Sequence, residues 1–267
     1  MQSEAIFLIR ILAIGDIVGL LGCKTIYENL KDIKKQYKID FVIANGENSA
    51  VGNGITKKSA EYLFSAGVDV LTGGNHLFKW HQFIDYIDKS QKIIRPANYP
   101  EGTPGRGFLE FNINNSKICI INISGLVYLE ALSCPLVCLD KILEKTKNIK
   151  IKILDFHAEA TAEKRAMGFY ADGRISAMFG THTHVQTSDE EILPKGTAYI
   201  TDVGMCGAVY SVLGVKPEIS IRRMKNKIPI KFEHDTCGPS KIECAYFDID
   251  EVTGKALGVK RLRFIFN

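Results

Sequence analysis

Two histidines separated by one residue, in the segment Gly-Thr-His-Thr-His at 180–184, are the residues whose types and spacing first suggest chemistry. They follow the apolar residues 175–179, which predict a short buried strand. Side chains at positions i and i+2 of an extended segment point the same way, so His182 and His184 are expected to project together. Imidazoles are good metal ligands but poor core residues, because both ring nitrogens need partners. Alone, this pattern is a weak indication of a metal site.

Carboxylate, amide and imidazole side chains follow four other predicted strands. Ligands of open α/β sheets bind outside the carboxyl ends of the strands, so these side chains are expected to converge. Taken singly, Asp16 and Asn75 could stabilise turns, His76 could cap a helix, and His157 could be a satisfied core residue. Together, and without an adjacent Lys or Arg to pair the carboxylates, they predict a ligand-binding centre. The strands are 6–14, 40–44, 68–72 and 150–156, and the residues that follow them are Asp16, Glu47, Asn48, Asn75, His76 and His157.

The candidate ligands are carboxylates, imidazoles and amide oxygens, with no cysteine among them. This set excludes a structural zinc knuckle and suits iron, manganese or zinc in an open catalytic site. Six or seven ligands are too many for one ion, whereas two ions bridged by a carboxylate would use them all. The sequence therefore predicts a dinuclear metal centre.

The elements that must position these residues alternate between strands and helices in the first half of the chain. Such alternation predicts parallel strands, and the hairpins further along add antiparallel ones. We expect one α/β domain, residues 1–267, with two mixed sheets. The other predicted strands are 108–113 and 117–123 (joined by the turn Asn114-Asn115-Ser116), 197–201, 230–232, 241–249 and 257–266. The predicted helices are 24–38, 57–66 with Thr56 as N-cap, one that carries Trp80 to Ile87, 136–146, 158–170 and 217–225, and residues 205–214 are predicted as a loop.

The composition is that of an ordinary soluble protein. The chain has 267 residues, 46% of them hydrophobic, and a net charge of +4. Lys31, Lys34, Lys35 and Lys38 predict the solvated face of a helix, and nothing in the chain resembles the clustered Lys and Arg of a nucleic-acid-binding arm, so we expect no DNA partner. Seven scattered cysteines without a CxxC pair predict no disulfide framework, so a reducing cytoplasm is expected. The apolar start is too short to span a membrane and contains Arg10, so we expect no membrane partner.

The segments around the candidate ligands resemble the five sequence blocks of the calcineurin-like metallophosphoesterases. The resemblance is closer to one branch, the YmdB-type cyclic-nucleotide phosphodiesterases, and runs from about Ile11 to the carboxyl-terminal strands. Val18 stands where the wider superfamily has a histidine, and Glu47 where it has an aspartate. The branch shares both departures, and its asparagine, here Asn48, takes the vacant coordination place. The segments that carry the resemblance are IGDIVG, NGEN, GNH, RPANYPEGTPGRG, DFHAEATAEK, GTHTHVQT and LPKGTAYITDVGM.

The resemblance implies a fold, a ligand set and a mechanism. The fold is a metallophosphoesterase-type α/β/β/α sandwich of two mixed sheets flanked by helices. Two metal ions are implied, iron first and manganese second, with a bridging hydroxide that attacks phosphorus and His76 as the acid that protonates the leaving alkoxide. One ion would be held by Asp16, Glu47, Asn48 and His184, and the other by Glu47, Asn75, His157 and His182.

Three functions stay open at this point. The first is a phosphodiesterase that acts on 2′,3′-cyclic nucleotides, on 3′,5′-cyclic nucleotides as well, or on a short RNA with a 2′,3′-cyclic phosphate end. The second is a phosphomonoesterase or nucleotidase, which the same metal centre would serve. The third is a regulatory, RNA-associated scaffold with a vestigial site, although such a site would be expected to have lost ligands. The loop 205–214 is either a substrate wall or an ordinary connection, and the oligomeric state is open, a homo-oligomer included.

Overall fold

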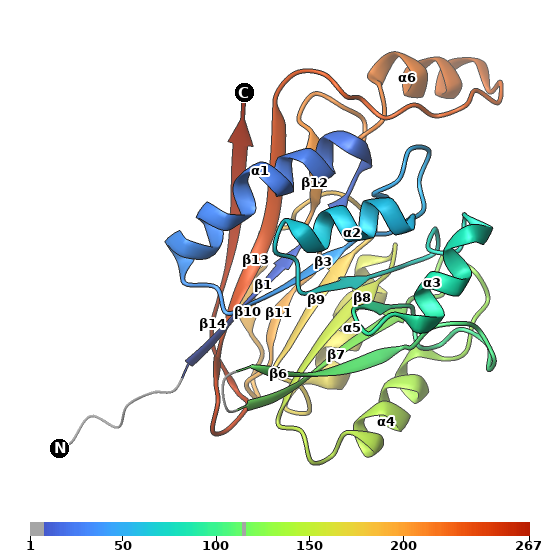
Figure 1. Cartoon of the computed structure of the whole chain (residues 1–267). Coiled ribbons are helices and arrows are strands. Elements are labelled where there is room, and N and C mark those ends of the chain that lie inside the picture. The colour runs from blue at the N-terminus through green and yellow to red at the C-terminus, as the bar shows by residue number, and fades with distance from the viewer. Residues whose placement is uncertain (1–7, 114–115) are drawn as a thin grey trace.

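The structure, a computed structural model, describes residues 8–113 and 116–267. Its architecture is an α/β/β/α sandwich, in which two mixed sheets pack face to face and helices cover the outer faces (Figure 1). The predicted fold class is therefore confirmed. Among the described helices, none is both long and apolar enough to cross a membrane.

The first sheet places parallel strands from the first half of the chain beside antiparallel strands from its carboxyl-terminal part. Its strands are β1 (Leu8–Ile14), β2 (Asp16–Ile17), β3 (Phe41–Asn45), β4 (Val70–Thr72), β5 (Ile93–Ile94), β12 (Met205–Ala208), β13 (Ser240–Asp250) and β14 (Ala256–Phe266). Their order is β2-β12-β13-β1-β3-β4-β5, with β14 paired to β13. The parallel strands β1, β3 and β4 therefore end at one edge of this sheet.

The second sheet is built mainly from parallel strands of the middle of the chain. Its strands are β6 (Phe108–Ile113), β7 (Ser116–Ser124), β8 (Ile151–His157), β9 (Ala177–Thr181), β10 (Glu191–Ile192) and β11 (Ala198–Ile200), in the order β10-β11-β9-β8-β7-β6. The antiparallel pairing of β6 with β7 confirms the predicted hairpin strands. The predicted turn residues Asn114 and Asn115 lie outside the described residues.

Helices cover both outer faces of the described sandwich. The helices α1 (Gly19–Tyr37) and α2 (Lys57–Ser65) pack on the first sheet, and α4 (Pro135–Lys145) and α5 (Thr161–Ala171) pack on the second. The predicted N-cap Thr56 of α2 is confirmed, because its side chain accepts a hydrogen bond from the backbone of Ser59. The remaining helical segments are the 3₁₀ turn η1 (His81–Phe83), α3 (Ile84–Lys89) and α6 (Pro217–Asn226).

The period-two alternation of the strands decides which side chains face the gap between the sheets. In β1, Ile11 lies in the core between the sheets and Leu12 in the core beneath α1, and in β8 Ile153 and Leu154 divide in the same way. Polar residues in the same phase near the carboxyl ends of the strands continue this inner face. They are Asn45, Thr72, Asn122, Asp155, His157 and Thr181, all buried.

Three predicted helix starts are wrong, and one of them is that of α5, which begins at Thr161 and not at residue 158. The helix α1 begins at Gly19 rather than Lys24, because glycines weaken the helical signal of its first turns. Gly22 is nevertheless needed there, since a Cβ would lie 2.6 Å from the carbonyl oxygen of Cys206 in β12. Trp80 precedes the 3₁₀ turn instead of lying within a helix.

Two predictions in the carboxyl-terminal part are also wrong. Residues 205–208, predicted as loop, form β12 and are buried between β2 and β13. Residues 230–232, predicted as a strand, form none in the described structure. They lie in a largely exposed segment, where Val215 and His234 form only an isolated bridge.

Candidate metal centre

The carboxyl ends of strands from both sheets meet at one place, and all eight predicted site residues lie there. Four of them, Asp16, Glu47, Asn48 and His157, are buried, and the other four are partly exposed, so the site has an interior part and an opening to the surface. The first sheet contributes Asp16 after β1, Glu47 and Asn48 after β3, and Asn75 and His76 after β4, and the second contributes His157 from β8 and His182 and His184 after β9.

A first group of polar atoms gathers around Asp16. The Nε2 atom of His184 lies 3.5 Å from Oδ1 of Asp16 and 3.3 Å from the amide nitrogen of Asn48. The same amide nitrogen lies 3.2 Å from Oε1 of Glu47. A half-turn of the Asn48 amide would present its oxygen to these atoms instead, as a metal ligand must.

A second group gathers around His157. Its Nε2 atom lies 3.0 Å from Oδ1 of Asn75, 3.1 Å from Nδ1 of His182 and 3.4 Å from Oε1 of Glu47. One ligand atom from each of Glu47, His157 and His182 can be chosen so that all three lie within 4.8 Å of one another. Oε1 of Glu47 thus lies beside both groups, which is the position of a bridging carboxylate.

Hydrogen bonds on the far side of His157 show which of its nitrogens is available for a metal. The hydroxyl of Thr181 lies 2.7 Å from Oδ1 of Asp155 and donates its only hydrogen there. It can therefore only accept from Nδ1 of His157, 2.9 Å away. In the neutral imidazole this leaves the lone pair on Nε2, which faces the second group.

Hydrogen bonds likewise show which nitrogen of His182 and of His184 is available for a metal. Nδ1 of His184 lies 3.0 Å from the carbonyl oxygen of Leu213, so its Nε2 carries the lone pair toward Asp16. Nε2 of His182 lies 3.0 Å from a carboxylate oxygen of Glu159, so its Nδ1 carries the lone pair toward the second group. In each histidine one ring nitrogen donates a hydrogen bond away from the site, and the other presents its lone pair to the group, as in metal-binding histidines. The donor set therefore fits two metal ions.

The two carboxylates need positive charge, because both are buried. Asp16 is 0% and Glu47 1% exposed, and among the described residues neither has a Lys or Arg nitrogen within 4.0 Å. Burial raises the pKa of Glu47, but the neighbouring His157 outweighs it and holds the pKa well below its usual range. Burial lowers the pKa of His157, and Glu47 reverses this, raising it to about 9. A proton on His157 thus balances the negative charge of Glu47 when no metal ion is bound. A bound metal ion would neutralise the same charge.

Gly74 has no side chain, and the ligand atoms of the second group occupy the space that a side chain would need. A Cβ at this position would lie 2.3 Å from Nε2 of His157 and 2.4 Å from Oε2 of Glu47. Since both are candidate ligand atoms, a side chain here would displace them. Glycine is therefore required next to Asn75 by the close approach of the ligands.

His76 lies at the opening of the site. Its backbone nitrogen donates to Oε2 of Glu47 at 2.9 Å, and its Nδ1 lies 3.0 Å from Oδ1 of Asn48. The side chain is 37% exposed, unlike the other imidazoles of the site. His76 therefore joins the buried groups to the surface, where a substrate can reach it.

The expected geometry of His182 and His184 is wrong, although both lie in the site. Strand β9 ends at Thr181, and the two histidines have φ angles of 99° and 63° rather than extended backbone. Their side chains consequently diverge, with His182 beside His157 and His184 beside Asp16. The division agrees with the ligand assignment that the resemblance implies, in which they serve different ions.

A buried ion pair that the sequence did not indicate holds this turn. Nζ of Lys164 lies 2.6 Å from Oδ2 of Asp202, and both side chains are fully buried. The same oxygen accepts from the backbone nitrogen of Thr183 at 3.2 Å and from its hydroxyl at 2.8 Å. Thr183 is thereby fixed between the two histidines. The only sequence signal was a lysine on the buried face of a predicted helix, which is rarely left unpaired.

An α/β/β/α sandwich with this donor set at the carboxyl ends of both sheets defines a metallophosphoesterase fold. The profile of the family described as YmdB-like protein matches residues 12–262, and the chain belongs to this family. A relative from Bacillus subtilis (strain 168), named 2′,3′-cyclic-nucleotide 2′-phosphodiesterase, is 44% identical over 254 residues, 95% of this chain and 96% of that protein.

Two solved structures share the fold over nearly their whole length. A structure described as a novel phosphatase from Mycoplasma pneumoniae matches with a TM-score of 0.93 and 35% identity, over 98% of this chain and 95% of that one. A hypothetical protein from Thermus thermophilus matches with a TM-score of 0.92 and 36% identity, over 97% of this chain and all of that one. The chain thus spans nearly the full length of these relatives.

Proposed function

We propose that the protein is a metal-dependent phosphodiesterase that hydrolyses 2′,3′-cyclic nucleotides. The observation that carries the proposal is the convergence of seven residues into two groups that share Glu47, with His76 beside them. The relative named for this activity, 44% identical over 95% of the chain, supports the choice of a cyclic diester as substrate. We extend the proposal to 3′,5′-cyclic nucleotides, since the same centre would serve that ring.

Two metal ions fit the two groups, and we propose iron first and manganese second. One would be held by Asp16, Glu47, Asn48 and His184, and the other by Glu47, Asn75, His157 and His182. Bound there, the ions would polarise the phosphoryl oxygens and make water a stronger nucleophile.

The protein's own side chains hold His76 in place and supply the proton that the leaving oxygen needs. His76, at the opening and outside both ligand sets, donates a proton to the ribose oxygen that leaves phosphorus. Oε1 of Glu47, 3.2 Å from Nδ1 of His76, orients the ring. Glu47 fixes the backbone of His76 as well, so one carboxylate places the acid and links both ligand groups. This arrangement supports a general acid held at a defined distance from the metals.

The test is a substrate panel on protein purified without oxygen, with metal content measured on the same sample. We expect about two metal ions per chain and preference for 2′,3′-cyclic AMP over 3′,5′-cyclic AMP, bis-p-nitrophenyl phosphate and p-nitrophenyl phosphate. The variant His81→Ala, which removes an exposed histidine outside the site, is the matched control and should behave like the parent protein. Preference for the monoester would reject the diesterase and favour the phosphomonoesterase.

We also propose the cytoplasm as the compartment, on the strength of seven scattered cysteines without a CxxC pair. Cell fractionation with detection of the native protein tests this. Recovery mainly with membranes or outside the cell would contradict it.

A further inference from the structure

The positive charge of the chain is concentrated in residues 216–233, which we call the basic arm. The arm contains α6 and the segment after it, and it projects from the sandwich (Figure 1). Six Lys or Arg and two Glu give it a formal charge of +4, which is the net charge of the whole chain. Lys216 pairs with Glu233, whereas the other basic residues have no acidic partner among the described residues. These are Arg222, Arg223, Lys225, Lys227 and Lys231.

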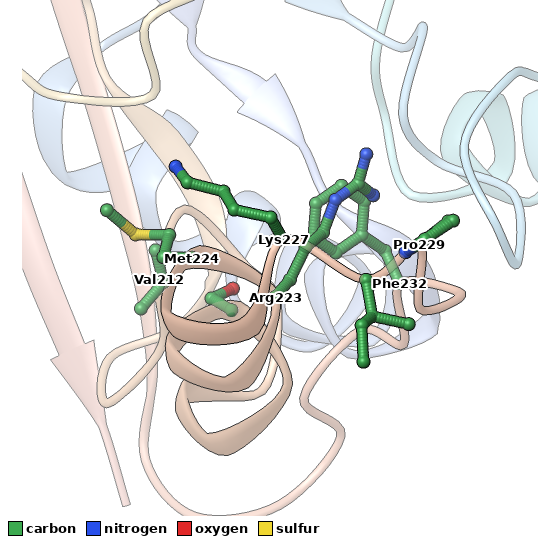
Figure 2. Close-up of a pocket in the computed structure, with 8 residues that line it drawn as sticks. Val212, Arg223, Met224, Lys227, Pro229 and Phe232 are labelled. Atoms are coloured by element: carbon green, nitrogen blue, oxygen red, sulfur yellow. The ribbon is translucent and has the colours of Figure 1, made fainter.

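The arm also exposes apolar and aromatic surface. The guanidinium of Arg223 lies 4.3 Å from the ring centre of Phe232. Both residues line a pocket of about 440 Å³ together with Met224 and Lys227 (Figure 2). Positive groups interleaved with aromatic and apolar side chains are typical of surfaces that bind single-stranded nucleic acid.

The base of the arm is fastened to residues beside the candidate metal centre. Val215 pairs with His234 across this base, and Nε2 of His234 lies 2.8 Å from Oδ1 of Asn53, in the loop that follows Asn48. The carbonyl oxygen of Leu213, just before the arm, accepts from His184. The arm is therefore held next to the opening of the site.

A cleft of about 1090 Å³ lies beside the arm, and its lining includes residues next to two site residues in the sequence. Its walls come from the start of α1, the loop 49–56, α2, Trp80 and the arm residue Lys231. Ser49 of its wall directly follows Asn48, and Trp80, 37% exposed, follows His76 by four residues. The volume exceeds the roughly 300–1000 Å³ of most small-molecule sites, so one nucleotide would not fill it.

The charged groups of the cleft are mainly positive. Lys24, Lys58 and Lys231 line it with Glu61, and Glu61 pairs with Lys57 outside the lining. Lys24 lies 3.7 Å from Glu28 in an exposed pair, while Lys58 and Lys231 have no acidic partner among the described residues. The three exposed lysines, beside the exposed rings of Trp80 and Tyr62, offer contacts for the phosphates and the bases of a strand.

We propose that this cleft and the basic arm bind single-stranded RNA whose 3′ end, a 2′,3′-cyclic phosphate, enters the metal centre. The proposal rests on the proposed function, because a 2′,3′-cyclic phosphate forms only on a ribose with a 2′-hydroxyl. DNA has no 2′-hydroxyl, so the nucleic acid that we expect in the cleft is RNA. Lys24, Lys58 and Lys231 contact phosphates upstream of the end, and Trp80 stacks on a base.

Binding is tested without turnover, so that it does not depend on the activity. Fluorescence anisotropy follows a single-stranded RNA of about ten nucleotides with a 3′-phosphate, titrated with the metal-loaded protein at several salt concentrations. In the triple variant K24Q/K58Q/K231Q, affinity at low salt should fall roughly 10-fold or more, and the slope of log affinity against log salt should flatten by about 2. The control K31Q/K35Q/K147Q removes three exposed lysines elsewhere and should bind like the parent protein.

Trp80 is tested by two variants, because its indole nitrogen also donates to the carbonyl oxygen of Asn53 at 2.8 Å. Trp80→Ala should weaken RNA binding roughly 5- to 150-fold, whereas Trp80→Phe, which keeps a stacking ring, should retain most of it. Equal loss in both variants would assign Trp80 to loop structure and overturn its stacking role.

Activity then separates this inference from the proposed function. Hydrolysis of 2′,3′-cyclic AMP should be the same in the parent protein and in K24Q/K58Q/K231Q, while hydrolysis of the RNA with a 2′,3′-cyclic end should fall in the variant. If neither substrate is hydrolysed by the parent protein, the proposed function fails while RNA binding is still measured. Equal RNA affinity in the parent protein, the triple variant and the control overturns the cleft as an RNA site.

Discussion

Replacement of Lys164 by methionine tests how the interior supports the candidate metal centre. Lys164 and Asp202 are both 0% exposed, and the ion pair between them measures 2.6 Å. Removal of one partner of such a pair costs about 3–5 kcal/mol, because a buried charge is left without compensation. Asp202 keeps three hydrogen bonds, from Thr183 and Gly204, so we expect the lower end, about 3 kcal/mol. For a chain of this size the melting temperature should fall by about 6–12 °C.

Three measurements decide whether this reasoning holds. Lys141→Met, on the exposed side of α4, is the matched control and should change stability by no more than about 0.5 kcal/mol. Lys164→Met/Asp202→Asn removes both charges and should recover part of the lost stability. Metal content should fall in Lys164→Met, because Thr183, which Asp202 holds, lies between the two histidine ligands. Unchanged melting temperature and metal content in that variant would refute the proposed support.

Three further substitutions test the residues of the centre itself. Glu47→Gln should lose metal, measured by elemental analysis, because it removes the only charge shared by both groups; full occupancy would rule out the bridging role. His76→Ala should keep its metal ions and lose about 10²–10⁴-fold in kcat on 2′,3′-cyclic AMP, and loss of metal instead would contradict its role as acid. Gly74→Ala should lose metal although the protein stays folded, since the added methyl overlaps ligand atoms of His157 and Glu47; normal metal content would contradict the close approach.

The positions of the site residues were predictable because each follows a strand with a clear pattern. His157 ends β8 in the same phase as Ile153, so its place between the sheets follows from the period of two. Which strands lie side by side did not follow from the pattern alone. The second sheet brings His157 and His182 to the first only because β8 and β9 pair in parallel.

Other features depend on contacts between distant parts of the chain. Cys206 forms β12 because it pairs with Ile17 on one side and Ile242 on the other, and a local window shows only a glycine-rich loop. The basic arm was not singled out because its residues were assigned to a helix, 217–225, and a strand, 230–232, rather than considered as one charged segment. Its charge becomes evident only when the rest of the chain is seen to be neutral.

The turn at His182 and His184 shows how tightly the two ligand groups are connected. Oδ1 of Asp16 faces His184 in the first group at 3.5 Å, while Oδ2 accepts from the backbone nitrogen of His182 at 3.0 Å. One carboxylate therefore contacts the first group directly and fixes the backbone of a residue that serves the second. Two residues with positive φ would otherwise relax toward more common backbone conformations. Because Asp16 and Asp202 hold successive residues of this turn, the backbone conformation that separates the two imidazoles is a property of the buried carboxylates as much as of the histidines.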